Sequence, residues 1–322
     1  MNRGAALEGA LLVTMASPAT WALALASFLL RGGLVLVALP ILVLPTPVGL
    51  GNVLAPTLTA FVFGGATPAL VAVAATIVLA VVLVVVAGGL LAAILEAEAA
   101  RIVAAHEEIA PEGGIRRHQL AVDELSEALT VRVARRRRAE AARIFVARLL
   151  ALLPFGVAAV WGTARLIAVT YRELTNPGDV GTPIVWRVLL ASPEVVIAIG
   201  LTWGLGEVLG GLAARRVVLG RAEVGPALAG AAMTLVRRPL AVLADFLLPT
   251  LALLLVLAPS TVAAGPAGDL VREAMNASGD PSELFLAVLL FVSLWIVGLA
   301  LIGVVCAWRA AVWTVAYGEA PR

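Results

Sequence analysis

Long uncharged stretches of hydrophobic residues alternate with arginine-containing segments along this chain. In the longest stretch, residues 32–95, 64 consecutive positions carry no charged side chain. Because a helix needs about 20 apolar residues to cross the hydrocarbon core of a bilayer, the pattern predicts six membrane-spanning helices. They are expected at residues 19–44, 69–95, 149–170, 188–212, 240–258 and 284–307. The predicted fold is an all-α, polytopic transmembrane helix bundle, with its six spans arranged as three hairpins.

The composition agrees with lipid as the main solvent. The chain has 322 residues, of which 61% are hydrophobic and 14% charged, against about 45–50% and 25% in soluble domains. All 23 basic residues are arginines, and the net charge is only +2. We attribute these arginines to the inner face of a membrane protein and expect no nucleic-acid partner.

Arginines are distributed unequally between the two sides of the predicted membrane. Ten lie in residues 96–148, five in residues 214–238 and three near the termini, whereas the opposite loops carry three. Basic residues concentrate in the cytoplasmic loops of membrane proteins. The sequence therefore predicts a multi-pass protein of the cell (inner) membrane with both termini in the cytoplasm.

The arginine-rich segment between the second and third spans has a helical pattern of its own. Apolar residues at helical spacing continue to about residue 109 and resume near residue 120, and Pro111, Gly113 and Gly114 favour a turn between them. We expect a cytoplasmic helical hairpin at residues 96–142, inserted into a single membrane domain that covers residues 1–322.

Four adjacent arginines lie near the end of this hairpin, before the third span. They are Arg135, Arg136, Arg137 and Arg138. Near an anionic bilayer surface each arginine contributes about 1 kcal/mol of attraction, so the run is a candidate site for anionic lipid headgroups. The alternative is that the run only fixes the topology, without specific lipid recognition.

A short pattern occurs twice in the chain. An Ala-Leu pair and a glycine in residues 6–10 are followed by Pro18 and a Phe-Leu-Leu run, and the same order recurs from residues 227–231 to Pro239 and beyond. A fainter copy begins at Glu127. Since proline is favoured in the first turn of a new helix, each copy predicts a cytoplasmic amphipathic helix, a breaker and then a hairpin of spans.

One of these copies resembles a known family. The stretch at residues 217–239, with Val-Val-Leu-Gly, Ala-Leu and Arg-Arg-Pro in order, is similar to the glycerophosphoryl diester phosphodiesterase membrane-domain family and to related uncharacterised bacterial polytopic proteins. The resemblance covers about the last third of the chain and implies the architecture alone. The soluble phosphodiesterase domain that can accompany this membrane part has no counterpart here, so no activity is implied.

Ionisable residues at membrane depth are candidate functional residues, because an unpaired charge there is costly. The third and fourth spans should form a hairpin in which residues whose numbers add up to about 357 lie at the same depth. Arg165 with Glu194, and Arg148 with Glu207, meet this condition. We expect ion pairs that fix the register of the helices; the alternative is a gated or proton-coupled pathway between the two pairs.

Two further charges lie within predicted spans. Arg31 is deep in the first span, and Asp245 is early in the fifth, in the equivalent part of the repeat. Either Arg31 extends back to the cytoplasmic headgroups, with Gly32 and Gly33 permitting a helix break, or it pairs with Asp245. In both cases we expect charge compensation and not substrate binding.

The predicted outer loop at residues 46–66 carries no charge and is rich in proline and glycine. Apolar backbone of this kind enters a bilayer only where protein covers it or where it lines a cavity. In that case Asn52, Thr57 and Thr59 line the cavity. Otherwise the loop is a packed extracellular cap.

No motif for catalysis, metal binding or a cofactor stands out from the sequence. We therefore expect a non-enzymatic envelope protein that associates with the lipid bilayer and organises lipids or a membrane-protein partner through its arginine-rich inner face. The alternative is a transporter or permease component that moves a small or lipidic substrate through a cavity between the repeats.

Cysteine accessibility tests the predicted topology. In the Arg135→Cys variant the thiol should react only with reagents that reach the cytoplasm, and in Asp269→Cys only with reagents added outside, because the arginine-rich side faces inward. The reverse labelling pattern would contradict this orientation.

Overall fold

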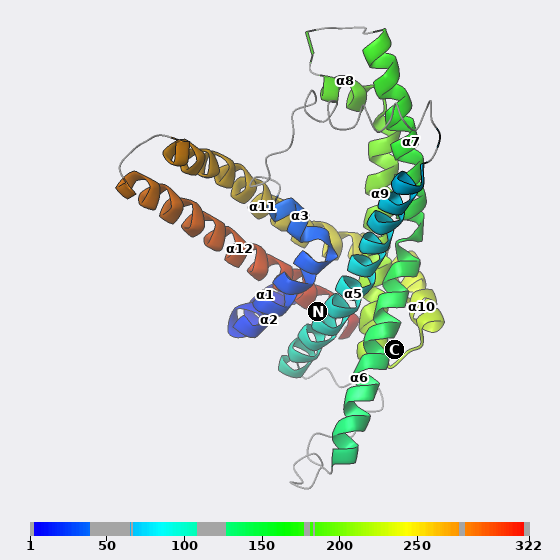
Figure 1. Ribbon diagram of the computed structural model, residues 1–322. Coiled ribbons are helices and arrows are strands. Elements are labelled where there is room, and N and C mark those ends of the chain that lie inside the picture. The colour runs from blue at the N-terminus through cyan, green and yellow to red at the C-terminus, as the bar shows by residue number, and fades with distance from the viewer. Residues whose placement is uncertain are drawn as a thin grey trace. The chain divides into compact units, whose positions relative to one another are not determined.

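The computed structural model describes residues 3–38, 65, 67–107, 127–176, 181–182, 184–276 and 281–318. Every regular element within these ranges is a helix, which confirms the all-α class (Figure 1). In chain order the helices are α1 (Arg3–Ala16), α2 (Pro18–Phe28), η1 (Leu29–Gly33), α3 (Leu34–Ala38), α5 (Pro68–His106), α6 (Glu127–Ala151), α7 (Leu153–Thr175), α8 (Ile184–Leu190), α9 (Pro193–Val218), α10 (Val224–Arg237), α11 (Pro239–Asn276) and α12 (Pro281–Gly318).

Six segments of the described chain are long and apolar enough to cross a membrane, as the sequence predicts. They are Pro18–Ala38, which comprises α2, η1 and α3, and the helices α5, α7, α9, α11 and α12. Helices α1, α6 and α10 precede α2, α7 and α11, so each hairpin follows a helix of its own. The chain is an integral membrane protein with six candidate spans.

Proline marks the beginning of each of these spans. The prolines occupy the first or second helical position: Pro18, Pro68, Pro154, Pro193, Pro239 and Pro281. The first N–H groups of a helix have no partner within it, so the missing N–H of proline costs little there, and its fixed φ suits the helix. Helices α1, α8 and α10 each end shortly before such a proline, namely Pro18, Pro193 and Pro239.

Two predicted span boundaries are wrong for this reason. The apolar run predicts a third span from residue 149, but α6 ends at Ala151 and α7 begins at Leu153. It predicts a fourth span from residue 188, but α8 ends at Leu190 and α9 begins at Pro193. Hydrophobicity continues through both breaks and does not reveal them, whereas Pro154 and Pro193 cannot lie inside a regular helix without disrupting it.

Large apolar side chains on the spans are not covered by the rest of the described chain. In the most apolar 18-residue window of α5, the buried share is 0%. Exposing that much hydrocarbon to water would be strongly unfavourable, at about 25 cal/mol for each Å². In a bilayer the acyl chains cover it.

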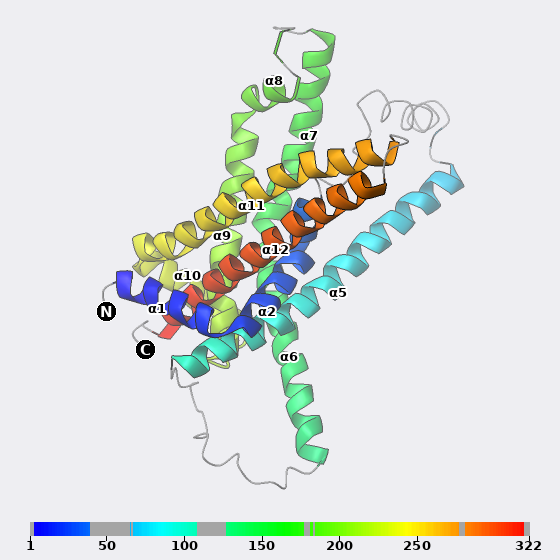
Figure 2. The ribbon, with the colours of Figure 1, turned by 90° about the vertical axis from the view of Figure 1, so that its left-hand side faces the viewer.

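Contacts divide the described chain into two compact units, and the first contains Met1–Val13, Ala100–Leu248 and Ala311–Arg322. Its central helix is α9, which packs against α6, α7 and α10. Helices α7 and α9 lie side by side in Figures 1 and 2. Small buried residues of α9, among them Gly206, Ala213 and Ala214, allow this close approach.

The register between α9 and its neighbours is the predicted one. A methyl group added at Gly162 would lie 2.8 Å from Val195 Cγ1, and one added at Gly206 would lie 3.0 Å from the Ala151 carbonyl oxygen. In both pairs the residue numbers add up to 357. Helices α6 and α7 therefore lie antiparallel to α9, one after the other.

The second unit contains Thr14–Ala99 and Pro249–Ala310. Its core combines residues of α2, α3, α11 and α12, namely Ala24, Val37, Leu253, Leu257, Ile302, Cys306 and Ala307. Three prolines lie inside α11: Pro249, Pro259 and Pro266. Membrane helices tolerate such prolines where nearby hydroxyls bond to helix carbonyls, and Ser260 Oγ donates to the Val256 oxygen at 2.7 Å.

The predicted cytoplasmic hairpin is described in part. Helix α5 continues beyond its apolar part to His106, and α6 begins at Glu127. Arg101 Nη2 lies 2.7 Å from Glu140 Oε1, so the two helices are joined along their described parts. The predicted turn at residues 111–114 lies outside the described residues.

The glycines of α9 allow a matched test of this packing. We expect Gly206→Val to destabilise the protein by about 1–3 kcal/mol, because the added side chain meets backbone and must displace α6. At Gly200 an added Cβ meets nothing within 4 Å, so Gly200→Val should leave stability almost unchanged. Size-exclusion chromatography of heated detergent extracts measures both, and equal melting midpoints for the two variants would refute the register.

Candidate functional site

Helices α1 and α10 are two copies of one unit. Each has 14 residues, each is followed by a single residue outside the helix (Ser17 or Arg238), and each leads to a proline that begins a span. The bounds of the two helices and both prolines differ by the same interval of 221 positions. The predicted repeat is thus confirmed in structure for these two copies.

Burial repeats along these two helices as well. Four positions on one side of α1 are exposed, Glu8, Leu11, Leu12 and Met15, and the four equivalent positions of α10 are exposed too, Ala229, Ala232, Met233 and Val236. These two sets are called the interfacial faces below. On the opposite side, Ala10 and its equivalent Ala231 are both 0% exposed. One small-residue side of each helix is packed against protein, and one side is not.

Apart from Glu8, the residues of both interfacial faces are apolar. Leu12 is 71% exposed and Met15 55%, while Met233 is 50% and Val236 76% exposed. Helices with one apolar side and flanking basic residues lie in the plane of the membrane interface, with that side about 5–10 Å deep in the headgroup boundary. The arrangement suits a helix that rests on lipid just before its chain turns into the bilayer.

Specific contacts fix the position of both helices. Trp21 Nε1 donates to the Thr14 carbonyl oxygen at 2.7 Å, across the break between α1 and α2. In the second copy, Arg216 of α9 donates from Nη2 to Thr234 Oγ1 at 3.0 Å. The Arg216 guanidinium packs against Gly230 of α10: a Cβ added there would lie 2.5 Å from Arg216 Nη1, so the arginine side chain would have to move.

The arginine run predicted to bind headgroups lies on α6. Arg135 is within this helix, and Arg136, Arg137 and Arg138 are exposed on it. In the register of α6 against α9, residue 138 is level with residue 219, where α9 has just ended. The arginine run therefore lies level with the end of the candidate span α9, on the arginine-rich side.

Helix α10 carries further basic residues at the same side. Arg237 and Arg238 are exposed where α10 ends and α11 begins. Arg143 of α6 lies 3.9 Å from Glu223, the residue before α10, and α6 and α10 are in contact. Exposed arginines therefore accompany an apolar interfacial face within one unit.

Both predicted ion pairs of the third and fourth spans are present. Arg165 Nε lies 3.2 Å from Glu194 Oε1, with both side chains exposed. Arg148 Nη1 lies 3.6 Å from Glu207 Oε1, with side-chain exposures of 12% and 15%. These contacts fit the predicted role of fixing the register of the helices.

A pair near the other end of this hairpin was not predicted. Arg187 of α8 lies 3.8 Å from Glu173 of α7, and both side chains are largely covered. Sequence reasoning missed it because residue 187 counts as part of a loop until α8 is seen as a helix.

Arg31 contacts Glu96, a partner that the sequence analysis does not name. Ser27 Oγ donates to the Ala92 oxygen at 3.3 Å, which sets α2 antiparallel to α5 and places position 31 level with about residue 88. Glu96 is eight residues nearer the arginine-rich end, about 12 Å along the helix. The Arg31 side chain therefore points toward that end, where it meets the buried Glu96 carboxylate. A contact of Arg31 with the headgroups stays a prediction.

A helix break accompanies this contact. Gly32 has φ of +102° inside η1, which departs from helical geometry at Arg31 and Gly32. Only glycine adopts such a φ without strain. The pairing of Arg31 with Asp245 joins residues of different units and stays a prediction.

The remaining predicted positions carry no further information. Asn52, Thr57 and Thr59 lie outside the described residues. Within the described ranges, no three His, Cys, Asp or Glu side chains gather in the way a metal site requires.

No protein-family model, curated protein or solved structure matches this chain.

The two ion pairs of the hairpin should contribute unequally to the free energy of unfolding. Removing the charge with Glu207→Gln takes the carboxylate away from Arg148 in a covered site, which should cost up to about 3–5 kcal/mol. Glu194→Gln, at an exposed pair, should change the melting midpoint much less.

Charge exchange provides the control. The double variant Arg165→Glu/Glu194→Arg should recover any stability lost in the single variants, since the attraction is restored. If Glu207→Gln and Glu194→Gln shift the melting midpoint equally, burial does not determine the strength of these pairs.

Proposed function

We propose that this membrane protein is a non-enzymatic, lipid-associated organiser of the inner face of the cell membrane. In this role its interfacial faces rest in the headgroup boundary, and its exposed arginines hold anionic headgroups. The observation that carries the proposal is the duplicated interfacial face of α1 and α10, which is uncovered in both copies and, apart from Glu8, apolar. One uncovered face can arise by chance, but the same four positions in both copies indicate a shared role.

Electrostatics supports the choice of an anionic lipid as the partner. Arg136 and Arg138 are exposed, level with the end of the candidate span α9. At an anionic membrane surface, each basic residue would be attracted with about 1 kcal/mol. Phosphate oxygens also accept paired hydrogen bonds from a guanidinium. With the arginine-rich side in the cytoplasm, both chain ends lie there too.

The transporter alternative has less support. A substrate pathway needs polar groups that converge on a cavity near the bilayer centre. Instead, the charged residues of the α7–α9 hairpin form ion pairs with one another. Arg31 of the first span pairs with Glu96, toward the arginine-rich end of α5. In a scaffold that binds lipid, these charged groups need only fix the register of the helices.

Lipid selectivity tests the proposal. Full-length protein in mixed micelles should retain phosphatidylglycerol over phosphatidylcholine during delipidation, as measured by native mass spectrometry. Arg136→Gln/Arg138→Gln should reduce this preference by roughly tenfold or more at low salt, since each arginine contributes about 1 kcal/mol.

A charge-matched variant provides the control. Arg172→Gln/Arg272→Gln removes two exposed arginines from the opposite side and should leave the preference unchanged. Equal losses in both double variants would show a nonspecific charge effect and overturn the proposed site. No preference in the unaltered protein would overturn the proposed function itself.

A further inference from the structure

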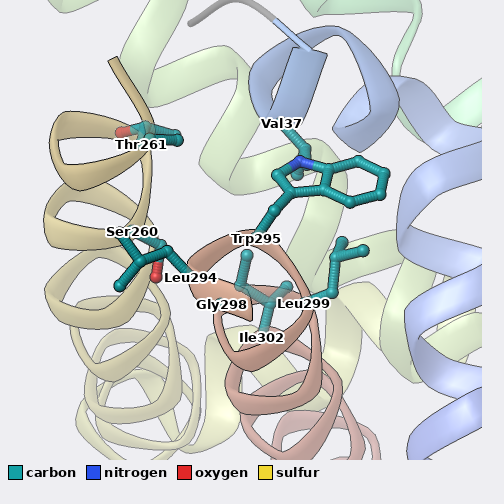
Figure 3. A pocket seen from close by; sticks show the side chains of 9 residues that line it. Val37, Ser260, Thr261, Leu294, Trp295, Gly298, Leu299 and Ile302 are labelled. Carbon is teal, nitrogen blue, oxygen red and sulfur yellow. The ribbon is translucent and has the colours of Figure 1, made fainter. Parts of the chain in front are cut away.

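Helices α11 and α12 of the second unit pack closely in their middle parts. They lie side by side in Figures 1 and 2. A Cβ added at Gly298 of α12 would lie 3.1 Å from Ser260 Cβ of α11 (Figure 3). The crevice beside these residues, lined also by Val37 and Trp295, has a volume of only about 10 Å³, which is room for about one water molecule. This part of the helix pair therefore has no space for a larger ligand.

Farther along, a groove opens between the same two helices. Its volume is about 470 Å³, within the roughly 300–1,000 Å³ of sites that bind small organic molecules. Just inward of this groove Gly268 faces Phe291, since a Cβ added at the glycine would lie 3.8 Å from the ring. The apolar residues that line the groove come from both helices and are Leu270, Ala274, Leu286, Ala287 and Leu290.

Two glutamates complete the lining of this groove, one from each helix. In the antiparallel helices the residue numbers of the facing pair Gly268 and Phe291 add up to 559. Those of Glu273 in α11 and Glu283 in α12 add up to 556, which places the two within about 5 Å of the same level along the helices. Two negative charges therefore line the outer end of the groove from opposite walls.

Neither of these carboxylates has a hydrogen bond or an ion pair within the described part of the chain. Arg272 is next to Glu273 in the sequence, but it donates from Nη1 to Asp269 Oδ1 of its own helix at 2.8 Å. It does not line the groove. The described lining thus carries two negative charges and no positive one.

The groove extends from the membrane interface toward hydrocarbon. Glu283 directly precedes the apolar run that begins at residue 284, and Arg309 follows the end of this run. The two residues are about 39 Å apart along the helix, which is more than the roughly 30 Å thickness of the hydrocarbon core. With Arg309 on the arginine-rich side, the two glutamates lie at the opposite surface, and the leucine and alanine walls lie deeper than Glu283.

These walls define the chemistry of a ligand. Two carboxylates attract a cation and accept its hydrogen bonds, while the apolar walls suit hydrocarbon. A metal ion fits poorly, because Ca²⁺ takes about 6–8 oxygen ligands and no third His, Cys, Asp or Glu of the described residues joins this pair. The ammonium group of phosphatidylethanolamine is accompanied by a phosphate, which two carboxylates repel.

We propose that this groove binds a free amphipathic amine. Its ammonium group lies between Glu273 and Glu283, and its apolar group extends along the groove for about 10 Å, the distance along α12 from Glu283 to Leu290. The site is separate from the arginine-rich face, and its ligand does not depend on the lipid role proposed above.

Fluorine NMR of the full-length protein in phosphatidylcholine nanodiscs tests the charge requirement. Fluorophenylbutylamine should show saturable line broadening beyond that in empty nanodiscs, whereas the neutral fluorophenylbutanol, with the same ring and chain, should not. Glu273→Gln/Glu283→Gln should weaken amine binding by about tenfold or more, because charge-assisted hydrogen bonds are lost. Glu194→Gln removes an exposed carboxylate outside the groove and should leave the affinity unchanged.

A steric variant tests the groove itself. Ala287→Phe fills the groove and keeps both carboxylates, so it should abolish the saturable phase. Val288→Phe makes a similar change at an exposed neighbour that does not line the groove, and should keep this phase. The proposal fails if Ala287→Phe binds the amine as the unaltered protein does, or if the alcohol binds equally well. It also fails if nanodiscs of phosphatidylethanolamine abolish amine binding, because the lipid headgroup then occupies the groove.

Discussion

Hydrocarbon offers a polypeptide no hydrogen bonds and solvates no charge, and the details of the described chain follow from this constraint. Backbone groups are satisfied within helices, and each span begins with a proline where no intrahelical donor is needed. Several hydroxyls inside spans donate to their own helix, as Thr163 does to Ala159 and Thr202 to Ala198, while Ser27 of α2 donates to Ala92 of α5. Charges within the spans contact opposite charges or extend toward an aqueous side.

The same constraint explains why the two copies of the repeat remain alike. A helix at the interface packs against protein on one side and contacts lipid on the other. The sizes of its buried residues and of its exposed residues are therefore both restricted. Ala10 and Ala231 pack inward, while Leu12 and Met233 remain outside. The span residues that hold these two helices differ. Trp21 donates to the Thr14 oxygen of α1 in the first copy, and Arg216 donates to Thr234 of α10 in the second. The common surface is therefore the feature that links structure to the proposed role in lipid organisation.

Sequence reasoning succeeds where geometry is set by depth alone. Arg165 with Glu194 and Arg148 with Glu207 are predictable because antiparallel helices of equal rise bring fixed number pairs together. The Arg31–Glu96 contact does not obey that rule, because a long side chain reaches past a helix break toward the surface. Span boundaries at Pro154 and Pro193 need the stereochemistry of proline and not hydropathy. Trp295 Nε1 is buried without a hydrogen-bond partner among the described residues, and this depends on packing between helices that no local pattern records.

Collision accessibility along α5 tests most directly whether lipid surrounds these helices. Spin labels placed one at a time at residues 71–86, where the described chain leaves every position exposed, would be read in reconstituted bilayers with oxygen and with a water-soluble nickel chelate. Oxygen concentrates in hydrocarbon and the chelate in water, so we expect frequent collisions with oxygen and few with nickel along the whole stretch. Frequent nickel collisions in the middle of this stretch would show that water covers it, and would contradict the account.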